Sequence, residues 1–297
     1  MSVAIPVDPA LWLSAARPKT LPAAVAPVAI GTAIALGEGT AHWGAALAAM
    51  LGALLIQIGT NLANDYFDFV NGADTINRTG PTRLTQAGLV TPEAMWRAAL
   101  ISFGLAAVVG LYLVARGGWP IVAVGVASIL SGILYTGGPW PFGYKGLGDV
   151  FVLVFFGPVA VAGTHYVQAL AFSPVAALAG LGPGLISVAI LAVNNLRDAE
   201  TDAIAGKRTL AVRLGPGFAR GEHALTLVAA ALLPAGFWLA GLAGPGVLMT
   251  LLMLPAAWPV IRTVATETDG AVLNAALGST GRLLMLYTVL FCAGWLV

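Results

Sequence analysis

The sequence predicts an all-α integral membrane protein, with nine transmembrane helices in one bundle around a central lipid-lined cavity. Charged residues make up only 9% of the 297 residues and hydrophobic ones 59%, whereas a soluble domain has about 25% charged residues. Long apolar segments recur along the chain, each near the roughly 20 residues that cross a bilayer. The single cysteine excludes a disulfide scaffold, and the net charge of +1 argues against nucleic acid as a partner.

The first half of the chain contains four of the nine expected spans. Arg17 and Lys19 precede the first span, which we expect to be retained in the membrane and not cleaved as a signal peptide. The second span leads into an acidic motif, and Arg116 separates the third from the fourth. These expected spans are, in order, residues 21–36, 43–62, 94–115 and 119–135.

The second half contains five further spans, and Lys145 precedes the first of them. Several of these spans contain proline, which a membrane bundle tolerates because neighbouring helices satisfy the freed backbone groups. No tandem repeat or appended soluble domain is visible, so we expect one transmembrane domain over residues 1–297. The expected spans are residues 150–171, 175–193, 224–242, 246–264 and 277–296.

Nearly all charges are predicted to lie on one side of the membrane. With an inside N-terminus, every basic residue except Arg116 falls on the cytoplasmic side, which is the positive-inside pattern of a multi-pass plasma-membrane protein. Every acidic residue except Glu38 falls there too, mostly in the long loops expected at 63–93 and 195–223. Acidic residues contribute little to topology. We therefore expect an enzymatic site facing the cytoplasm, with the C-terminus on the opposite face.

The first acidic motif lies at the end of the second span. Its amides and carboxylates follow i+3 and i+4 steps, so a helix would present them on one face. Gly72 then permits the helix to end, and Asp74 falls in the following loop. The members of the helical face are Asn61, Asn64, Asp65 and Asp68.

The second acidic motif lies about 130 residues further along and repeats this pattern. Asn194, Asp198 and Asp202 are spaced four residues apart. Gly206 follows as a helix stop, and basic residues come next. The two motifs are expected on the same side of the membrane, so we expect them to form one site.

The chemistry of both motifs favours a magnesium–diphosphate site. Neighbouring carboxylates repel each other unless cations accompany them. A donor set of oxygens without Cys or His favours Mg²⁺ over zinc, and Mg²⁺ is typically held by one or two carboxylates together with substrate phosphates. Basic side chains nearby supply donors for phosphate oxygens: Arg78, Arg83, Lys145, Lys207 and Arg208.

Several stretches resemble the UbiA superfamily of intramembrane prenyltransferases, and within it the branch that acts on 1,4-dihydroxy-2-naphthoate. That branch is indicated by Gly-Pro-x-Arg-Leu-Thr-Gln at 80–86 and by Tyr-Thr-Gly-Gly-Pro at 135–139. The resemblance covers roughly two thirds of the chain. The matching stretches are residues 16–23, 64–74, 80–88, 135–139, 143–149 and 194–210.

The resemblance implies transfer of a polyprenyl group from polyprenyl diphosphate to 1,4-dihydroxy-2-naphthoate, with loss of CO₂ and diphosphate, giving demethylmenaquinone. It implies that Mg²⁺ bridges the diphosphate to Asp65 and Asp68 on one side and to Asp198 and Asp202 on the other. Asp74 is a further candidate metal ligand, although it comes later than the third aspartate of the family pattern.

The resemblance also implies roles for other residues. Lys145 joins the four aspartates Asp65, Asp68, Asp198 and Asp202 as a catalytic candidate. The candidates for diphosphate binding are Asn64, Arg78, Arg83, Lys145, Lys207 and Arg208. The candidates for orienting the acceptor or shielding a carbocation are Tyr135, Tyr144, Asp149, Asn61 and Asn194.

Two alternatives stay open from the sequence. Another acceptor, such as 4-hydroxybenzoate, homogentisate or a tetrapyrrole, would use the same acidic motifs. A cation-coupled transporter could also hold acidic pairs in broken helices, but it should show charged residues near the middle of its spans and on both faces. The sequence has almost none there.

Overall fold

The computed structural model describes residues 8–73 and 83–297, and within them every regular element is helical. Asp74 and Arg78 lie outside the described residues. The helices of the first half are α1 (Pro9–Ala16), α2 (Pro22–Gly37), α3 (Trp43–Val70), α4 (Pro92–Gly117) and α5 (Trp119–Leu134). Those of the second half are α6 (Gly148–Val154), α7 (Ala160–Ala169), α8 (Pro174–Ala179), α9 (Leu181–Ile204), α10 (Leu210–Leu214), α11 (Pro216–Leu239), α12 (Met253–Thr266) and α13 (Gly270–Leu296).

The helices are long and apolar enough for a multi-pass membrane protein. Among the described residues, seven helical segments can cross a membrane by length and composition, and the pair Pro9–Thr20 and Pro22–Gly37, bent by 56°, brings the number to eight. Trp119–Leu134 is apolar but shorter. The predicted all-helical membrane bundle is confirmed, whereas its division into nine spans stays a prediction.

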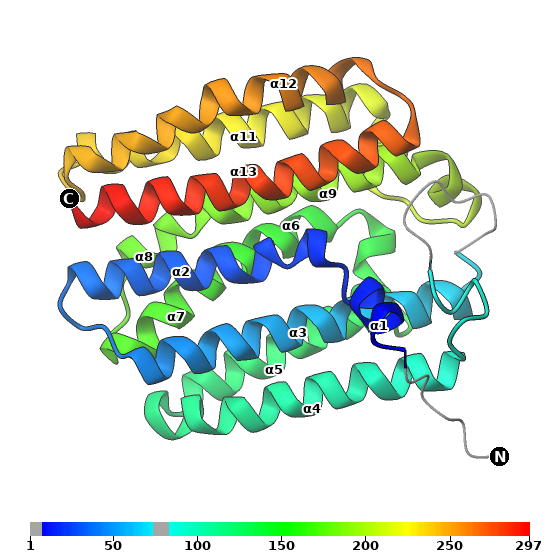
Figure 1. The fold of residues 1–297 in the computed structure, drawn as a ribbon, viewed down its shortest axis with the longest axis horizontal. Helices are drawn as coiled ribbons and strands as arrows, with labels where there is room; N and C mark the ends of the chain where they lie inside the picture. Colours follow the sequence, from blue (N-terminus) through cyan, green and yellow to red (C-terminus); the bar gives the residue numbers. More distant parts are fainter. Residues whose placement is uncertain (1–7, 74–82) are drawn as a thin grey trace.

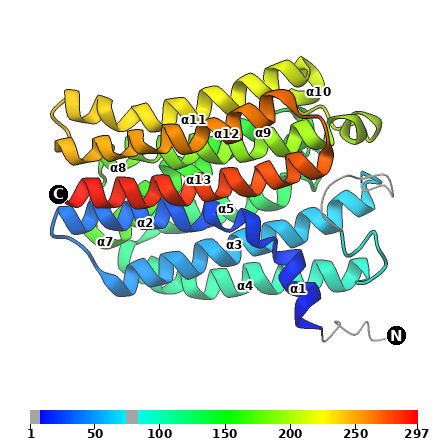
Figure 2. The same cartoon turned by 45° about the horizontal axis from the view of Figure 1, so that its top comes forward.

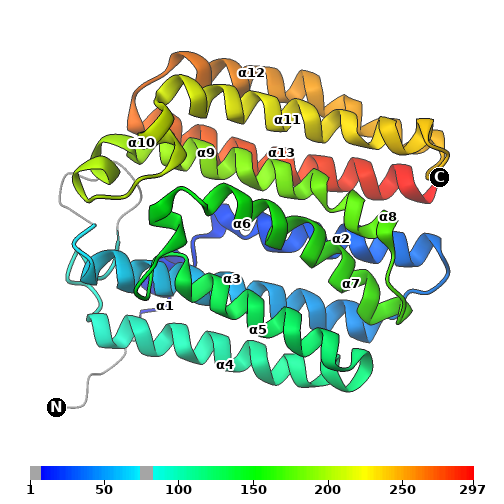
Figure 3. The same cartoon turned by 180° about the vertical axis from the view of Figure 1, so that it is seen from behind.

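The long helices run side by side along one common direction (Figure 1). One group contains α9, α11, α12 and α13, and another contains α3, α4 and α5, with α2, α6 and α7 between them (Figures 1 and 3). The C-terminus lies at one end of the bundle, and α1 lies nearer the other end (Figure 2). The C-terminal ends of α3 and α9 lie at the end of the bundle opposite the C-terminus, so both acidic motifs are on one side (Figure 1).

Two helices run further than the membrane spans expected at those positions. The expected spans ended at residues 62 and 193, but α3 continues to Val70 and α9 to Ile204. The long loops expected from 63 and 195 therefore begin inside helices, and these expected boundaries were wrong. The physical reason is that the polar side chains of both motifs are buried within the bundle, so polarity did not mark the helix ends.

The two extended helices end in the same way. At the end of α3, the backbone N–H of Ala73 donates to the carbonyl of Asp68 over 2.8 Å, and at the end of α9 that of Lys207 donates to Asp202 over the same distance. Gly72 and Gly206 have φ of 69° and 75°, a left-handed conformation that favours glycine at a helix end. The predicted glycine stops are confirmed.

The two charges predicted on the opposite face have local partners at the C-terminal end of α7. Glu38 accepts from the buried His165 ring over 2.6 Å. Arg116 donates to the carbonyls of Val167 and Gln168. These contacts satisfy both charges without involving the acidic motifs.

Candidate active site

A cavity of about 590 Å³ opens between α2, α3, α4, α5, α6, α7 and α9. At one end it is lined by Asp68, Asp198 and Asp202. Towards the other end its walls are the apolar side chains of α4, α5 and α7, such as Val114 and Ile121. An apolar pocket with a few convergent polar groups is the usual form of a ligand site. This cavity has charged side chains at one end and apolar side chains along the rest of its wall.

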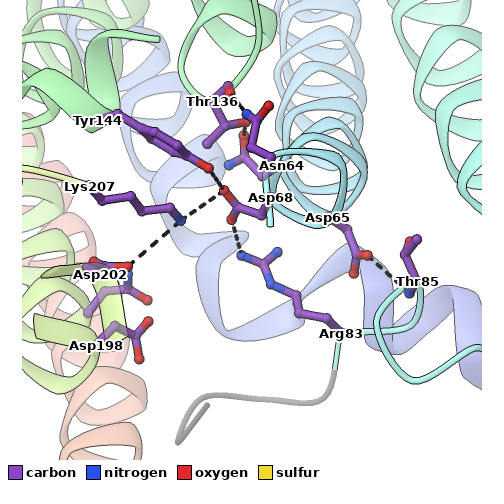
Figure 4. Close-up of polar contacts among 12 residues, drawn as sticks. Asn64, Asp65, Asp68, Arg83, Thr85, Thr136, Tyr144, Asp198, Asp202 and Lys207 are labelled. Carbon is purple, nitrogen blue, oxygen red and sulfur yellow. Dashed lines mark hydrogen bonds and ion pairs between the residues drawn. The ribbon is translucent and has the colours of Figure 1, made fainter. Parts of the chain in front are cut away.

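Asp68 contacts three polar or charged side chains at the polar end. It is 2% exposed, and Arg83 Nη2 and Lys207 Nζ each lie 2.8 Å from one of its oxygens. The Tyr144 hydroxyl donates to the same carboxylate over 2.7 Å (Figure 4). Three segments distant in sequence therefore meet at Asp68, and the structure brings together four of the predicted residues there.

Lys207 connects the two acidic motifs. Its ammonium lies 2.8 Å from Asp68 and 3.8 Å from Asp202, and 4.7 Å from the centre of the Tyr144 ring. Lys207 reaches this position because α9 ends at Ile204 and the positive φ of Gly206 then turns the chain. One cation thus shares its charge between carboxylates that would otherwise repel each other.

Asp65 lies outside the cavity lining. Its buried carboxylate accepts the backbone N–H groups of Leu84 and Thr85, each over 3.2 Å (Figure 4). The reason is its helical position, because Asp65 follows Asn64 and is rotated about 100° further around α3. The structure therefore does not bring Asp65 together with the other three aspartates. It places this carboxylate under the segment that carries Arg83.

Arg197, which was not predicted as a site residue, is a buried partner of the second motif. Its guanidinium donates to both oxygens of Asp198, over 2.6 and 2.8 Å. It also donates to the side-chain oxygens of Asn194 and Asn274. Adjacent helical residues normally point in different directions, so nothing in the sequence indicated that Arg197 folds back onto its neighbour. This network fixes the orientation of Asp198 towards the cavity.

The predicted amides also line the cavity, and each has a partner. Asn61 donates to the Ala16 carbonyl over 2.9 Å and to the Thr20 hydroxyl over 3.1 Å. Asn64 accepts from the Thr136 hydroxyl over 2.8 Å (Figure 4). These bonds attach α3 to the N-terminal segment and to the end of α5, so they hold the walls of the polar end together.

Aromatic rings extend from the polar end along the cavity wall. Tyr135 contacts Phe142 edge to face at 5.7 Å, Phe142 stacks on Phe151 at 3.8 Å, and Phe151 is parallel to Phe155 at 6.1 Å. All four line the cavity. Tyr135 was predicted here. The three phenylalanines were missed: Phe151 and Phe155 had only a four-residue spacing within an apolar segment as a signal, and Phe142 had none.

Besides Asp65, three predicted residues lie away from the cavity lining. Lys145 and Arg208 line a second, smaller hollow next to it. Asp149 is buried at the start of α6 and is not part of either lining. The structure therefore does not bring these residues together with the three aspartates of the polar end.

The donor set of the polar end fits Mg²⁺ held jointly with a phosphate ligand. In the described part of the chain, no group of three or more His, Cys, Asp or Glu side chains is arranged to hold a metal by itself. The cavity offers Asp68, Asp198 and Asp202 with amide oxygens and no thiol or imidazole among its lining residues. Mg²⁺ is usually held by one or two carboxylates, and phosphate oxygens complete its coordination shell.

Comparisons with known proteins agree with this geometry. The chain is 42% identical to 1,4-dihydroxy-2-naphthoate octaprenyltransferase of Mycobacterium tuberculosis, covering 86% of this chain and 82% of that one. It is 40% identical to the Escherichia coli protein of the same name, covering 95% and 94%. Both alignments extend well beyond the acidic motifs.

The fold is similar to solved structures as well. A UbiA homologue from Archaeoglobus fulgidus bound to GPP and Mg²⁺ superimposes with a TM-score of 0.65 at 16% identity, covering 96% of this chain and 99% of that one. The model of the UbiA prenyltransferase family matches residues 24–277, from the first span to the last. The chain therefore belongs to the UbiA prenyltransferase family.

Proposed function

We propose that the protein transfers a polyprenyl group from polyprenyl diphosphate to 1,4-dihydroxy-2-naphthoate, with loss of CO₂ and diphosphate, giving demethylmenaquinone in its quinol form. The main support for this proposal is that a single cavity has three carboxylates at its polar end and a long apolar wall beyond them. The names of the M. tuberculosis and E. coli relatives support the choice of acceptor.

The diphosphate would bind at the polar end. Asp68, Asp198 and Asp202 are the candidates for holding Mg²⁺. Asp74, which lies outside the described residues, stays a further predicted ligand, whereas Asp65 would hold the segment that carries Arg83. When bound, Mg²⁺ would neutralise the departing diphosphate and orient it. Arg83 and Lys207 already contact Asp68. They would donate to the phosphate oxygens, because hydrogen bonds between a cation and a phosphate are stronger than neutral ones. Asn64 would add a neutral donor from its amide.

The reaction would then run along the cavity wall. The bond between the allylic carbon and the diphosphate oxygen breaks, and its electron pair leaves with the diphosphate. Tyr135 and Phe142 present aromatic rings that stabilise the allylic cation. The electron-rich naphthoate ring attacks that carbon, and the carboxylate leaves as CO₂, returning its electron pair to the ring. Asn194 and Tyr144 line the space in which the acceptor would be oriented.

We propose that the chain forms a single domain over residues 1–297 with nine spans in the plasma membrane. The polar end would face the cytoplasm, because nearly all basic residues fall on that side. Water would quench an allylic cation, and a lipid-surrounded cavity limits its access. The acceptor would enter from the cytoplasm and the prenyl chain from the bilayer.

An acceptor panel tests the proposal. Membranes containing the protein are incubated with Mg²⁺, octaprenyl diphosphate and one of three acceptors: 1,4-dihydroxy-2-naphthoate, 4-hydroxybenzoate or homogentisate. We expect a prenylated product only with the naphthoate, together with CO₂ released from its labelled carboxyl group. Prenylation of another acceptor instead would overturn the choice of substrate while leaving the family assignment intact.

A further inference from the structure

A second hollow, of about 470 Å³, lies beside the polar end of the cavity. Two segments form it: the loop over residues 139–145, and the loop that follows α9 together with the start of α10, over residues 206–213. The backbone N–H of Arg208 donates to the Tyr144 carbonyl over 2.9 Å. Gly146 packs so closely that a Cβ there would lie 2.9 Å from the Arg208 carbonyl. The two segments are therefore fixed to each other.

Three cationic side chains line this hollow, and all three are exposed to solvent: Lys145, Arg208 and Arg213. The lining includes no carboxylate, and within residues 8–73 and 83–297 none of the three lies within ion-pair distance of an acidic side chain. Like charges held close together without a counter-charge repel each other, so this arrangement is suited to an anion of more than one charge.

Two other basic residues, Arg220 and Arg282, have partners of their own. Arg220 donates to the Glu267 carbonyl over 3.0 Å, and Arg282 donates to the Ser279 hydroxyl over 2.8 Å. The positive-inside rule explains why cations lie on one side, but it does not explain why three of them share one hollow.

Tyr144 separates the hollow from the cavity, since it lines both. Its hydroxyl donates to Asp68, and Lys207 lies over its ring. A phosphate group at the polar end and one in the hollow would therefore be on opposite sides of one side chain, next to Lys207. Among the described residues, Tyr144 alone lines both spaces.

We propose that this hollow is a second phosphate-group site, which holds free diphosphate outside the reaction cavity after it has left the prenyl chain. The identity of this occupant rests on the proposed function, whereas the preference for a multiply charged phosphate anion rests on the three cations alone. Because the hollow contributes no carboxylate, its binding of diphosphate does not need a divalent cation. Of the three cations, Lys145 and Arg208 are also predicted diphosphate ligands, whereas Arg213 is not, so Arg213 belongs to this site alone.

Binding of inorganic diphosphate to the purified protein, in neutral detergent with EDTA, tests the proposal. We expect saturable binding by the wild type, weakened roughly tenfold in the double variant Arg208→Gln/Arg213→Gln because two charge-assisted contacts are lost. Arg213→Gln alone should show an intermediate loss. Arg262→Gln removes an exposed arginine of α12 and should bind as the wild type does, which controls for net charge.

Two results would overturn the proposal: no saturable binding by the wild type in EDTA, or unchanged binding by the double variant with a normal size-exclusion profile. A titration with phosphatidylglycerol distinguishes free diphosphate from a lipid headgroup. We expect no displacement, and displacement would reassign the site to the lipid. Since no prenyl transfer is measured, failure here is distinguishable from failure of the proposed reaction.

Discussion

At the residue scale, the polar end of the cavity is held by pairs of opposite charge. Asp68 contacts Arg83 and Lys207, and Asp198 contacts Arg197. Buried carboxylates and guanidinium groups need such partners because desolvation of each charge is costly. The pairing also prepares the site for a phosphate ligand, whose oxygens can share the same cations once Mg²⁺ neutralises the carboxylates.

Asp65 provides a residue-scale prediction, because its geometry differs from that of Asp68. We expect Asp65→Asn to lower turnover while leaving the Mg²⁺ concentration for half-maximal rate unchanged, since Asp65 holds the backbone of Leu84 and Thr85 and lies outside the cavity lining. Magnesium titration of the prenyl-transfer rate provides the measurement. Asp68→Asn, the comparison variant, should raise that concentration. A similar rise in Asp65→Asn would show that Asp65 is itself a ligand.

At the element scale, the interface between α9 and the bent segment after α6 depends on glycine. Gly157 interrupts the helix between α6 and α7, where its backbone is non-helical and Pro158 follows. A Cβ added at Gly180 would lie 2.7 Å from the Gly157 oxygen, and one added at Gly184 would lie 2.7 Å from the oxygen of Leu153 at the end of α6. Only glycine lets the two backbones approach this closely, and the approach sets the position of Phe155 in the cavity wall.

Gly184→Ala tests this interface. A Cβ at this position would lie 2.7 Å from the Leu153 carbonyl oxygen and 3.1 Å from the Gly157 Cα, so the backbones must separate. We expect thermal stability in detergent to fall, with a loss of about 1–3 kcal/mol, as for other overpacked sites. Gly236→Ala on α11 is the control, since nothing lies within 4 Å of its added Cβ. Equal melting temperatures for the two variants would contradict the close-contact account.

At the scale of the whole molecule, the sequence predicted the membrane bundle and the meeting of both acidic motifs because these depend on hydropathy and helical spacing. The spacing also predicted the glycine helix ends at Gly72 and Gly206. The spans expected to end at residues 62 and 193 stopped short of the ends of α3 and α9, since buried polar residues look like loop residues in a sequence. The side-chain directions of Asp65 and Arg197 and the second basic hollow depend on tertiary packing, which no local pattern encodes.

The central claim is that the two acidic motifs form one prenyl-transfer site, and product formation in matched variants tests it most directly. Purified protein is mixed with Mg²⁺, octaprenyl diphosphate and 1,4-dihydroxy-2-naphthoate, and the prenylated product is quantified by mass spectrometry. We expect Asp68→Asn and Asp198→Asn each to lower the rate by at least about a hundredfold, as expected when charge stabilisation of a leaving group is lost. Glu200→Gln, on an exposed position of α9, should retain the wild-type rate. Near-normal rates in folded Asp68→Asn and Asp198→Asn would contradict the claim.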